Sequence, residues 1–372
     1  MSEHRHWLAL LRAAGVGPAL GRALLAHCGP QAESVFAAGR AAWRAAGASD
    51  AVCAALATPD WPGVEQDLAW LEQPRHHFIP LDDARYPARL KTISDAPLAL
   101  YVVGDTEVLS LPQLGIVGSR NPTTGGIEHA REFAEYLGRN GLVITSGLAL
   151  GIDAAAHEGA LAANSLTVAV LGTGPDQVYP ARHKNLAARI ADSGALVSEF
   201  PPGTPALAEH FPRRNRLISG LSLGVLVVEA ALKSGSLITA RLALEQGREV
   251  FAIPGSIHNP LAKGCHRLIR EGAKLVESGQ DIFEELGSAL GPAFVPGPPS
   301  VDNARPAQKA GRAEADVDYS RLLTALGHEP QRVDQLVEAT GLTIAAVSSM
   351  LLILELQGQV AVAPGGAYVR NR

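Results

Sequence analysis

Short apolar runs without strict alternation of apolar and polar residues recur along the middle of the chain. Between them lie stretches in which apolar residues return with the period of a helix. Strands buried on both faces lack alternation, as in parallel sheets that helices cover on both sides. The pattern therefore predicts a doubly wound, mostly parallel α/β sheet. The predicted strands are 114–117, 142–146, 167–171, 195–199, 224–229, 249–253 and 274–276, preceded by shorter runs at 78–80 and 100–103.

Three other segments differ from this α/β pattern. Residues 1–75 are rich in Ala and Leu with helical period, which predicts a small bundle of short helices. Residues 287–317 are rich in proline and poor in apolar residues, as is typical of a flexible linker. Residues 318–372 predict three helices and then a β-hairpin, the order of a winged-helix domain. We therefore expect a helical domain, an α/β domain over residues 76–286, and a winged helix after the linker.

Two local features bear on how the flanking domains act. Gly15-Val16-Gly17 lies between predicted helices and could hold a phosphate on its amides, as in helix-hairpin-helix modules, or be a plain connector. The third helix of the predicted winged helix has no Lys or Arg between Thr343 and Gly358. Duplex binding depends on phosphate contacts from basic groups. We therefore prefer to interpret the tail as a protein-contact or regulatory module and not as a domain that reads duplex DNA.

Composition narrows the possible functions. The chain is 47% hydrophobic with a formal net charge of −5, so any nucleic-acid binding must come from a local basic cluster. Cys28, Cys53 and Cys265 form no CxxC pair, which argues against a disulfide framework or a zinc site and fits a reducing cytoplasm. Neither a signal-peptide pattern nor an apolar run of roughly 20 residues is found. We expect a cytoplasmic protein without a cofactor.

The loops that follow the predicted parallel strands combine Gly or Ser turns with basic residues. Gly118-Ser119-Arg120 opens a helix, whose N-terminus favours an anion, although its spacing is not that of a dinucleotide fingerprint. Ligands of such sheets bind outside the carboxyl ends of the strands. One such loop can be a plain turn, but several suit a chain of phosphates, and Phe211 adds a stacking surface for single-stranded nucleic acid. The candidate DNA-binding residues are Gly118, Ser119, Arg120, Ser146, Gly147, Arg182, Lys184, Phe211, Arg213, Arg214, Asn215, Arg216, Lys233, Ser234, Gly235 and Ser236.

Two pairs of titratable residues have both a chemical and a structural interpretation. Asp153 and His157 are four residues apart on a predicted helix and could be a metal pair. No third ligand has suitable spacing, so Asp153 as a helix N-cap and His157 as a packed or hydrogen-bonded residue are favoured. Glu199 and Glu229 both end predicted strands. They could be an acid/base pair or could hold the arginine loop by ion pairs.

Seven motifs lie along the α/β region. They are Gly-Ser-Arg at 118–120, Ser-Gly-x-Ala-x-Gly-Ile-Asp at 146–153, Ala-Val-Leu-Gly at 169–172, Phe-Pro-Arg-Arg-Asn-Arg at 211–216, Val-Val-Glu-Ala at 227–230, Ser-Gly-Ser-Leu-Ile-Thr-Ala at 234–240 and Gln-Gly-Arg-Glu-Val-Phe-Ala-Ile-Pro-Gly at 246–255. Together these motifs resemble the DNA-processing protein A family, DprA, also called Smf, from about Tyr86 to Leu286. The resemblance implies an extended Rossmann-like domain that binds and protects incoming single-stranded DNA. It also implies a homodimer that loads a RecA-type recombinase during natural transformation, without catalysis.

The resemblance assigns contacts residue by residue, and this chain departs from it in places. Some family members have a lysine directly after Tyr-Pro and another before Phe-Pro, where this chain has Ala181 and about Ala208. The charge would then come from Arg182, Lys184 and Arg213. The DNA contacts that the resemblance implies are Arg120, Phe211, Arg214, Asn215, Arg216 and the Ser234–Ser236 turn.

The resemblance also implies a dimer contact. The family pairs its protomers through the segment that matches residues 265–276. His266, Ile269 and Leu275 are the expected contacts, and ordinary packing of these residues against the sheet is the alternative.

Two other functions remain open on the sequence. Lonely Guy-type nucleotide phosphoribohydrolases share this architecture and carry a Pro-Gly-Gly-x-Gly-Thr-x-x-Glu signature. Residues 233–239 do not reproduce its second and third glycines, which favours DNA binding. The third possibility is a regulatory protein–protein hub that acts mainly through the winged helix.

Overall fold

The computed structural model describes residues 4–290, 317–327, 330–356, 359–363 and 366–370. These residues belong to two compact units, Met1–Pro298 and Pro299–Arg372. Most of the predicted linker lies outside the described residues. Within the described part of the chain, no helix is both long and apolar enough to cross a bilayer.

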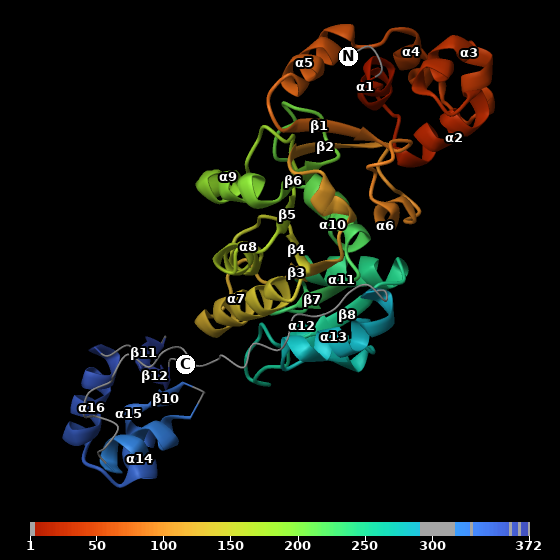
Figure 1. Ribbon diagram of the computed structural model, residues 1–372. Helices are drawn as coiled ribbons and strands as arrows, with labels where there is room; N and C mark the ends of the chain where they lie inside the picture. Colours follow the sequence, from red (N-terminus) through yellow and green to blue (C-terminus); the bar gives the residue numbers. More distant parts are fainter. Residues whose placement is uncertain (1–3, 291–316, 328–329, 357–358, 364–365, 371–372) are drawn as a thin grey trace. The chain divides into compact units, whose positions relative to one another are not determined.

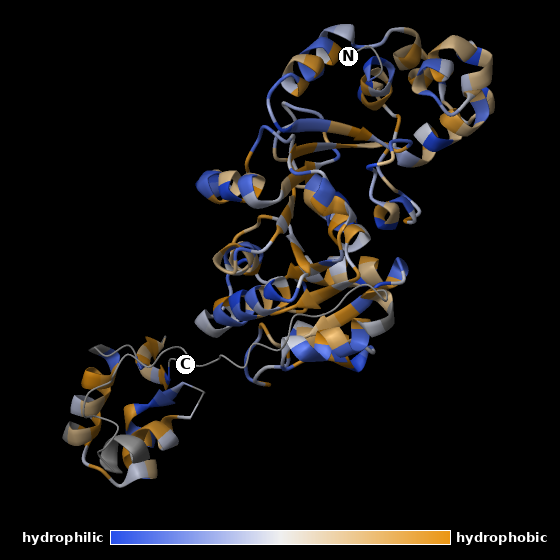
Figure 2. Ribbon diagram, viewed as in Figure 1, coloured by the Kyte–Doolittle hydropathy of each residue, from blue (hydrophilic) through white to orange (hydrophobic). Residues whose placement is uncertain are grey.

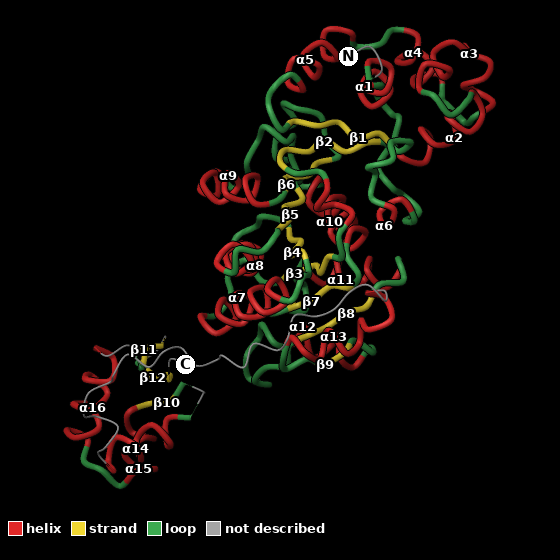
Figure 3. The backbone as a smooth tube through the Cα atoms, in the orientation of Figure 1, coloured by secondary structure: helices red, strands yellow, loops and turns green. Residues whose placement is uncertain are grey.

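The first unit is built on a sheet that has nine strands among the described residues (Figures 1 and 3). In space the strands follow the order β1-β2-β6-β5-β4-β3-β7-β8-β9. Neighbours from β6 to β9 run parallel, while β1 pairs with β2, and β2 with β6, antiparallel. The predicted doubly wound, mostly parallel sheet is confirmed. The strands are β1 (His76–Pro80), β2 (Ala99–Gly104), β3 (Gln113–Val117), β4 (Val143–Ser146), β5 (Thr167–Val170), β6 (Ala195–Ser198), β7 (Gly224–Val227), β8 (Glu249–Ala252) and β9 (Lys274–Leu275).

The direction of strand addition reverses at β3. Leu114 of β3 pairs with Ile144 of β4 on one side and with Gly224 of β7 on the other. The chain adds β4, β5 and β6 outward from β3, and then returns to place β7 on its free side. In doubly wound sheets the ligand crevice lies outside the carboxyl ends of the strands at such a switch point. The loops after β3 and β7 therefore flank the first place where a ligand is expected.

Helices cover both faces of the sheet. Ile116 packs into the core beneath α7, and its neighbour Val117 packs into the core beneath α10, because successive strand residues point to opposite faces. Apolar strands accordingly lie between the helical layers (Figure 2). The helices are α6 (Ala88–Lys91), α7 (Thr124–Arg139), α8 (Ile152–Ala162), α9 (Lys184–Ser193), α10 (His210–Leu221), α11 (Ser236–Glu245), α12 (Lys263–Arg270) and α13 (Gly279–Leu286), with 3-10 turns η1 (Glu107–Ser110), η2 (Ala181–His183) and η3 (Gly287–Leu290).

The N-terminal helices dock on the antiparallel end of the sheet. Their buried residues share one core with Phe78 of β1 and Tyr101 of β2. Arg12 binds the fully buried Asp67 through two nitrogens, at 2.7 and 2.8 Å, and the Tyr101 hydroxyl lies 3.4 Å from the same carboxylate. This ion pair joins the first and fifth helices to the sheet. The helices are α1 (Arg5–Arg12), α2 (Pro18–Cys28), α3 (Ala32–Ala45), α4 (Asp50–Ala57) and α5 (Trp61–Leu71).

The second unit has the predicted three helices and hairpin. A short strand, β10, adds to the hairpin and gives the sheet order β10-β12-β11. This strand is not predicted from the sequence, where the second helix is expected to begin at Arg332 and Gln331 is assigned to no element. In the third helix, α16, Leu352 is 56% exposed beside exposed Ser348 and Ser349, so the face of this helix away from the core is partly apolar and has no basic residue. The elements are α14 (Val317–Leu326), β10 (Gln331–Arg332), α15 (Val333–Thr340), α16 (Ile344–Leu356), β11 (Val360–Ala363) and β12 (Ala367–Arg370).

The buried ion pair predicts a measurable difference between two arginines of α1. Arg12→Ala leaves the Asp67 carboxylate buried without its cation, which is expected to lower the free energy of unfolding by about 3 kcal/mol. Arg5→Ala is the matched control, because its pair with Glu65 is exposed on both sides and is expected to contribute less than about 1 kcal/mol. Urea unfolding of the two variants makes the comparison. Equal losses would show that the buried pair is not what ties the helices to the sheet.

Candidate nucleic-acid interface

Two loops and the first turn of α10 bring a cation and two aromatic rings together at the carboxyl edge of the sheet. Arg120, after β3, places its guanidinium carbon 5.8 Å from the ring centroid of Phe211, at the start of α10. The centroid of the Tyr179 ring, after β5, lies 5.4 Å from that of Phe211. Phe211 is half-buried against Gly172, where a Cβ would come within 2.9 Å of the ring, whereas Tyr179 is 53% exposed. The cluster therefore presents one positive charge and one open aromatic face to solvent.

Tyr179 was not among the predicted site residues. The signal that could have identified it was an aromatic residue in a loop that also carries Arg182 and Lys184. Such interleaving of rings and cations is the pattern that single-stranded nucleic-acid sites use. Arg182 and Lys184 are both exposed in the structure.

The guanidinium of Arg214 is buried instead of facing the rim. Its Nη1 donates to the carbonyl oxygen of Gly147 at 2.6 Å and to that of Val170. A Cβ at Gly147 would lie 2.5 Å from the guanidinium, so only glycine fits there. Burial lowers the pKa of Arg214 to about 10, which still leaves the group charged at neutral pH. Arg214 thus ties α10 to the ends of β4 and β5.

Arg216 is also buried, and it shares Glu199 with Arg213. One oxygen of Glu199, Oε2, accepts from Arg216 at 2.6 Å and from Arg213 at 2.8 Å. Asp95 binds Arg216 from the other side at 3.0 Å. The side chain of Arg213 is 47% exposed and stacks over Phe200, with 5.1 Å from its guanidinium carbon to the ring centroid. Of the three arginines in this helix, only Arg213 faces solvent.

The acid/base interpretation of Glu199 and Glu229 is wrong. Glu199 follows β6 and Glu229 follows β7, which lie four strand positions apart in the sheet. At about 4.8 Å per strand that separation is on the order of 19 Å, too far for one reacting group. Glu199 holds the arginine loop, as the alternative predicted. Glu229 instead binds the loop after β3, through Thr123.

The Asp153–His157 pair is structural, with one correction. The N-cap of α8 is Gly151, and Asp153 lies inside the helix, where its carboxylate accepts from the amides of Gly147 and Ala149 at 3.1 and 3.4 Å. His157 is fully buried and hydrogen-bonded to Thr167, as expected. Among the described residues, no group of three or more potential ligands could hold a metal ion.

The remaining predicted site residues divide by exposure. Ser119 and Ser146 are buried, and the Ser146 hydroxyl donates to the carbonyl of Ile116 at 2.6 Å. The hydroxyls of Ser234 and Ser236 lie 2.7 Å apart and close the turn after β7. The exposed or half-buried members are Gly118, Lys233, Gly235 and Asn215.

The predicted dimer contacts lie at the β9 edge of the sheet. Leu275 is 42% exposed on this edge strand. Ile269 is half-buried and packs partly against the core, and the imidazole of His266 lies 2.9 Å from the carbonyl oxygen of Gly255. Their role in pairing two protomers stays a prediction.

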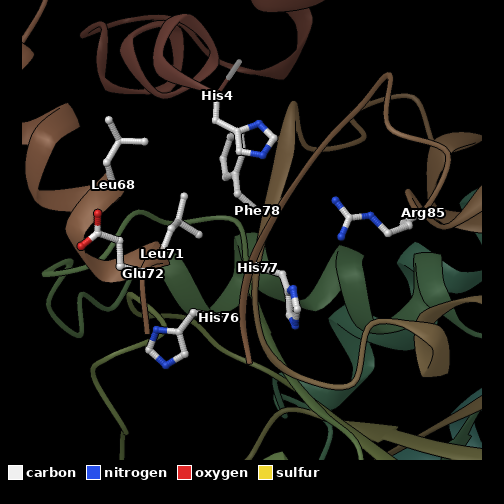
Figure 4. A pocket seen from close by; sticks show the side chains of 8 residues that line it. All are labelled: His4, Leu68, Leu71, Glu72, His76, His77, Phe78 and Arg85. Carbon is white, nitrogen blue, oxygen red and sulfur yellow. The ribbon is translucent and has the colours of Figure 1, made fainter. Parts of the chain in front are cut away.

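A pocket of about 290 Å³ lies elsewhere, beside β1 (Figure 4). Its residues come from the N-terminal helices and their ends, from β1 and, for Arg85, from the loop after β1; the ring of His77 and the guanidinium of Arg85 face it from one side (Figure 4). Arg85 is held by Asp83 at 2.6 Å. None of the predicted DNA-binding residues lines this pocket. Its lining is His4, Leu68, Leu71, Glu72, His76, His77, Phe78 and Arg85.

Comparison with known proteins identifies related sequences over both units. The chain matches the family of DNA recombination-mediator protein A over residues 77–287 and the DprA winged helix domain over residues 305–366. It is 49% identical over 310 residues to Protein Smf of Escherichia coli (strain K12), which covers 83% of this chain and 81% of that protein. Over an alignment of 409 residues it is 35% identical to Protein Smf of Synechocystis sp. This alignment covers 100% of this chain and 99% of that protein.

Solved structures confirm the fold. The crystal structure of DNA processing protein A (DprA) from Streptococcus pneumoniae matches with a TM-score of 0.68 and 37% identity, covering 76% of this chain and 97% of that one. DNA processing protein A from Helicobacter pylori, described for its unique single-stranded DNA binding mode, matches with a TM-score of 0.52 and 32% identity over 57% of this chain and 97% of that one. The predicted family and fold class are therefore confirmed.

The buried histidine predicts how stability depends on pH. Thr167 donates its hydroxyl to the carbonyl of Ile144, so it must accept from Nδ1–H of His157, which leaves the buried Nε2 without a partner. Burial lowers the pKa of His157 to about 3, and the unfolded chain therefore binds the proton first. His157 makes its full contribution to the free energy of unfolding above pH 6.5. That contribution is lost at about 1.4 kcal/mol per pH unit as the pH falls toward 3.

His157→Asn should flatten this dependence, because its amide can donate in place of Nδ1–H and does not titrate. Urea unfolding between pH 7.5 and pH 4.5 measures the slope. The matched control is His258→Asn, since His258 is exposed. An unchanged slope in His157→Asn would mean that other groups set the acid sensitivity.

Proposed function

We propose that this chain, which belongs to the DNA processing protein A family, binds single-stranded DNA along the carboxyl-end loops of its parallel sheet. The observation that carries the proposal is the cluster of Arg120, Phe211 and Tyr179. A phosphate can approach Arg120 while a base stacks on the exposed Tyr179 ring. The described binding mode of the Helicobacter pylori relative supports the same class of ligand.

The rim residues divide into cations that contact DNA and arginines that position them. Arg214 and Arg216 act from inside the protein, because both guanidinium groups are already bound to protein oxygens. A strand that follows the rim crosses the loops in the order of the strands, from β6 past β3 to β7. The exposed cations proposed to bind phosphate are Arg120, Arg182, Lys184, Arg213 and Lys233.

Family membership supports a wider role. We propose that the protein protects incoming single-stranded DNA in the cytoplasm and loads a RecA-type recombinase on it during natural transformation. We also propose a homodimer that pairs through the β9 edge, where Leu275 is exposed beside Ile269 and His266. The names of relatives, DNA processing protein DprA in Streptococcus pneumoniae and Bacillus subtilis, support DNA processing.

We further propose that the protein is not an enzyme. The phosphoribohydrolase alternative needs a carboxylate free to act on a nucleotide. Glu199 is engaged by two arginines, and Glu229 is engaged by Thr123. Sustained release of free base or phosphate from nucleotides, lost on substitution of either glutamate, would restore the enzymatic alternative.

The direct test compares single- and double-stranded oligonucleotides of equal length by fluorescence anisotropy. The protein should prefer the single strand with little dependence on base sequence. The logarithm of the binding constant should fall with the logarithm of salt concentration at roughly −0.7 per phosphate neutralised. Equal or tighter binding of the duplex would contradict the proposal.

Variants separate stacking from charge at the rim. Tyr179→Ala and Phe211→Ala should each weaken binding by roughly 1–3 kcal/mol without changing the salt slope, because stacking does not release counterions. Arg120→Glu should weaken binding and flatten the slope. Arg139→Glu is the control, since Arg139 ends α7 at the far end of the sheet.

Melting temperatures show whether a variant that binds more weakly has also lost stability. Phe211 packs on Gly172, so its loss should also lower the melting temperature, while loss of the exposed Tyr179 ring should not. If neither aromatic variant weakens binding and Arg120→Glu binds like Arg139→Glu, the rim is not the DNA site.

The winged helix is expected to add little single-strand affinity. Its third helix carries no basic residue, and the unit Met1–Pro298 is compact by itself. A chain truncated after Pro298 should retain affinity within tenfold of the full chain. A larger loss, more than about 1.4 kcal/mol, would mean that the tail contacts DNA directly.

A further inference from the structure

The switch point of the sheet already contains an anion that belongs to the protein. Glu229, which follows β7, reaches across to the N-terminus of α7, which follows β3. Its Oε2 accepts the amide N–H of Thr123 at 2.9 Å, and its Oε1 accepts the Thr123 hydroxyl at 2.7 Å. The same Thr123 oxygen accepts from the amide of Gly126 at 3.0 Å, so the carboxylate and the helix end form one hydrogen-bonded chain.

This position is the one that a nucleotide phosphate takes in doubly wound folds. Helix N-termini at the switch point offer free amides and a partial positive charge to an anionic ligand. Here the carboxylate fills that place. A Cβ at Gly126 would lie 2.6 Å from Glu229 Oε2, so the carboxylate lies against the first turn of α7 and occupies the space beside Gly126. Glu229 itself is 8% exposed, so its carboxylate is buried at this helix end.

Glu229 has no side-chain cation to account for its burial. Among the ion pairs that the structure records between described residues, none includes Glu229. The cap of α7 does not require the Glu229 carboxylate, because the Thr123 side chain already caps this helix by accepting from the Gly126 amide. The positive partner of the carboxylate is therefore the helix end itself.

We propose that Glu229 determines specificity by acting as a built-in anion that excludes the phosphates of free nucleotides from the switch point. Arg120, which lies in the loop that Glu229 holds, remains exposed at the rim, where a polymer can bring phosphates to it. The protein then accepts a strand that lies across several loops and rejects mononucleotides that need one deep phosphate site. The acceptance of a strand rests on the proposed DNA binding, whereas the rejection of mononucleotides does not.

Small side chains at this position should create a phosphate site. Glu229→Ala removes a carboxylate of about the size of the missing ligand and leaves the Thr123 amide and hydroxyl free. Glu229→Ser is a second variant with the same space and a hydroxyl that can satisfy one donor. Glu229→Gln is the matched control, because it fills the space and can accept the Thr123 amide while it removes the charge.

The probes are inorganic phosphate and AMP, and the readout is the melting temperature of the full chain as ligand is added. A ligand that binds only the folded state raises the melting temperature in a saturable way. We expect phosphate and AMP to stabilise Glu229→Ala and Glu229→Ser with dissociation constants about tenfold or more below any shown by wild type or Glu229→Gln. AMP should also compete with single-stranded DNA for the two small variants only.

Several outcomes would overturn this inference. AMP stabilisation of the wild type would show that the crevice is open, and this arm decides even if both small variants fail to fold. A folded Glu229→Ala or Glu229→Ser without a phosphate response would show that Glu229 does not occupy an anion site. Failure of the wild type to bind single-stranded DNA would remove the proposed function but leave the melting assay valid, because that assay contains no DNA.

Discussion

The carboxyl edge of the sheet depends on the buried guanidinium of Arg214. A charge taken out of water must be matched by protein oxygens, and here the carbonyls of Gly147 and Val170 supply them. These carbonyls end β4 and β5, so the interaction fixes the start of α10 against two strands at once. Asp153 completes the arrangement by holding the amides of the loop that contains Gly147. The position of Phe211, one turn earlier in α10, follows from this anchor.

Buried carboxylates fix the loops on either side of this anchor in the sheet. Glu199, which follows β6, binds Arg213 and Arg216. Glu229, which follows β7, binds Thr123 in the loop after β3. Each carboxylate is buried, and each fixes a segment that also carries an exposed cation, Arg213 in the first and Arg120 in the second. Buried charges are costly to separate, so these loops are held in place before any ligand arrives. A preorganised rim loses less conformational entropy on binding than a flexible one.

Much of the fold could be predicted from the sequence because it depends on local patterns. Unbroken apolar runs identified the parallel strands, and Gly118-Ser119-Arg120 marked the turn at the first of them. The candidate site was harder to predict from the sequence, because the sequence shows that Arg214 and Arg216 are charged but not that they are buried. Burial depends on which carbonyls and carboxylates the distant strands bring to them. Tyr179 was missed for the converse reason, since an isolated tyrosine in a loop has no periodic signal.

The division between inner and outer arginines bears on the proposed DNA binding, because this chain lacks two cations that the family resemblance implies for some members. Ala181 and Ala208 are both exposed at the rim and offer no cation there. Because Arg214 and Arg216 are committed to the scaffold, they cannot replace those charges. Stacking on Tyr179 and Phe211 does not depend on counterion release, so it can carry a larger share of the binding energy. In the proposed complex, fewer rim cations weaken the attraction to phosphates but leave stacking on unpaired bases unchanged. Single strands would then be favoured over duplex, whose bases are already stacked on one another.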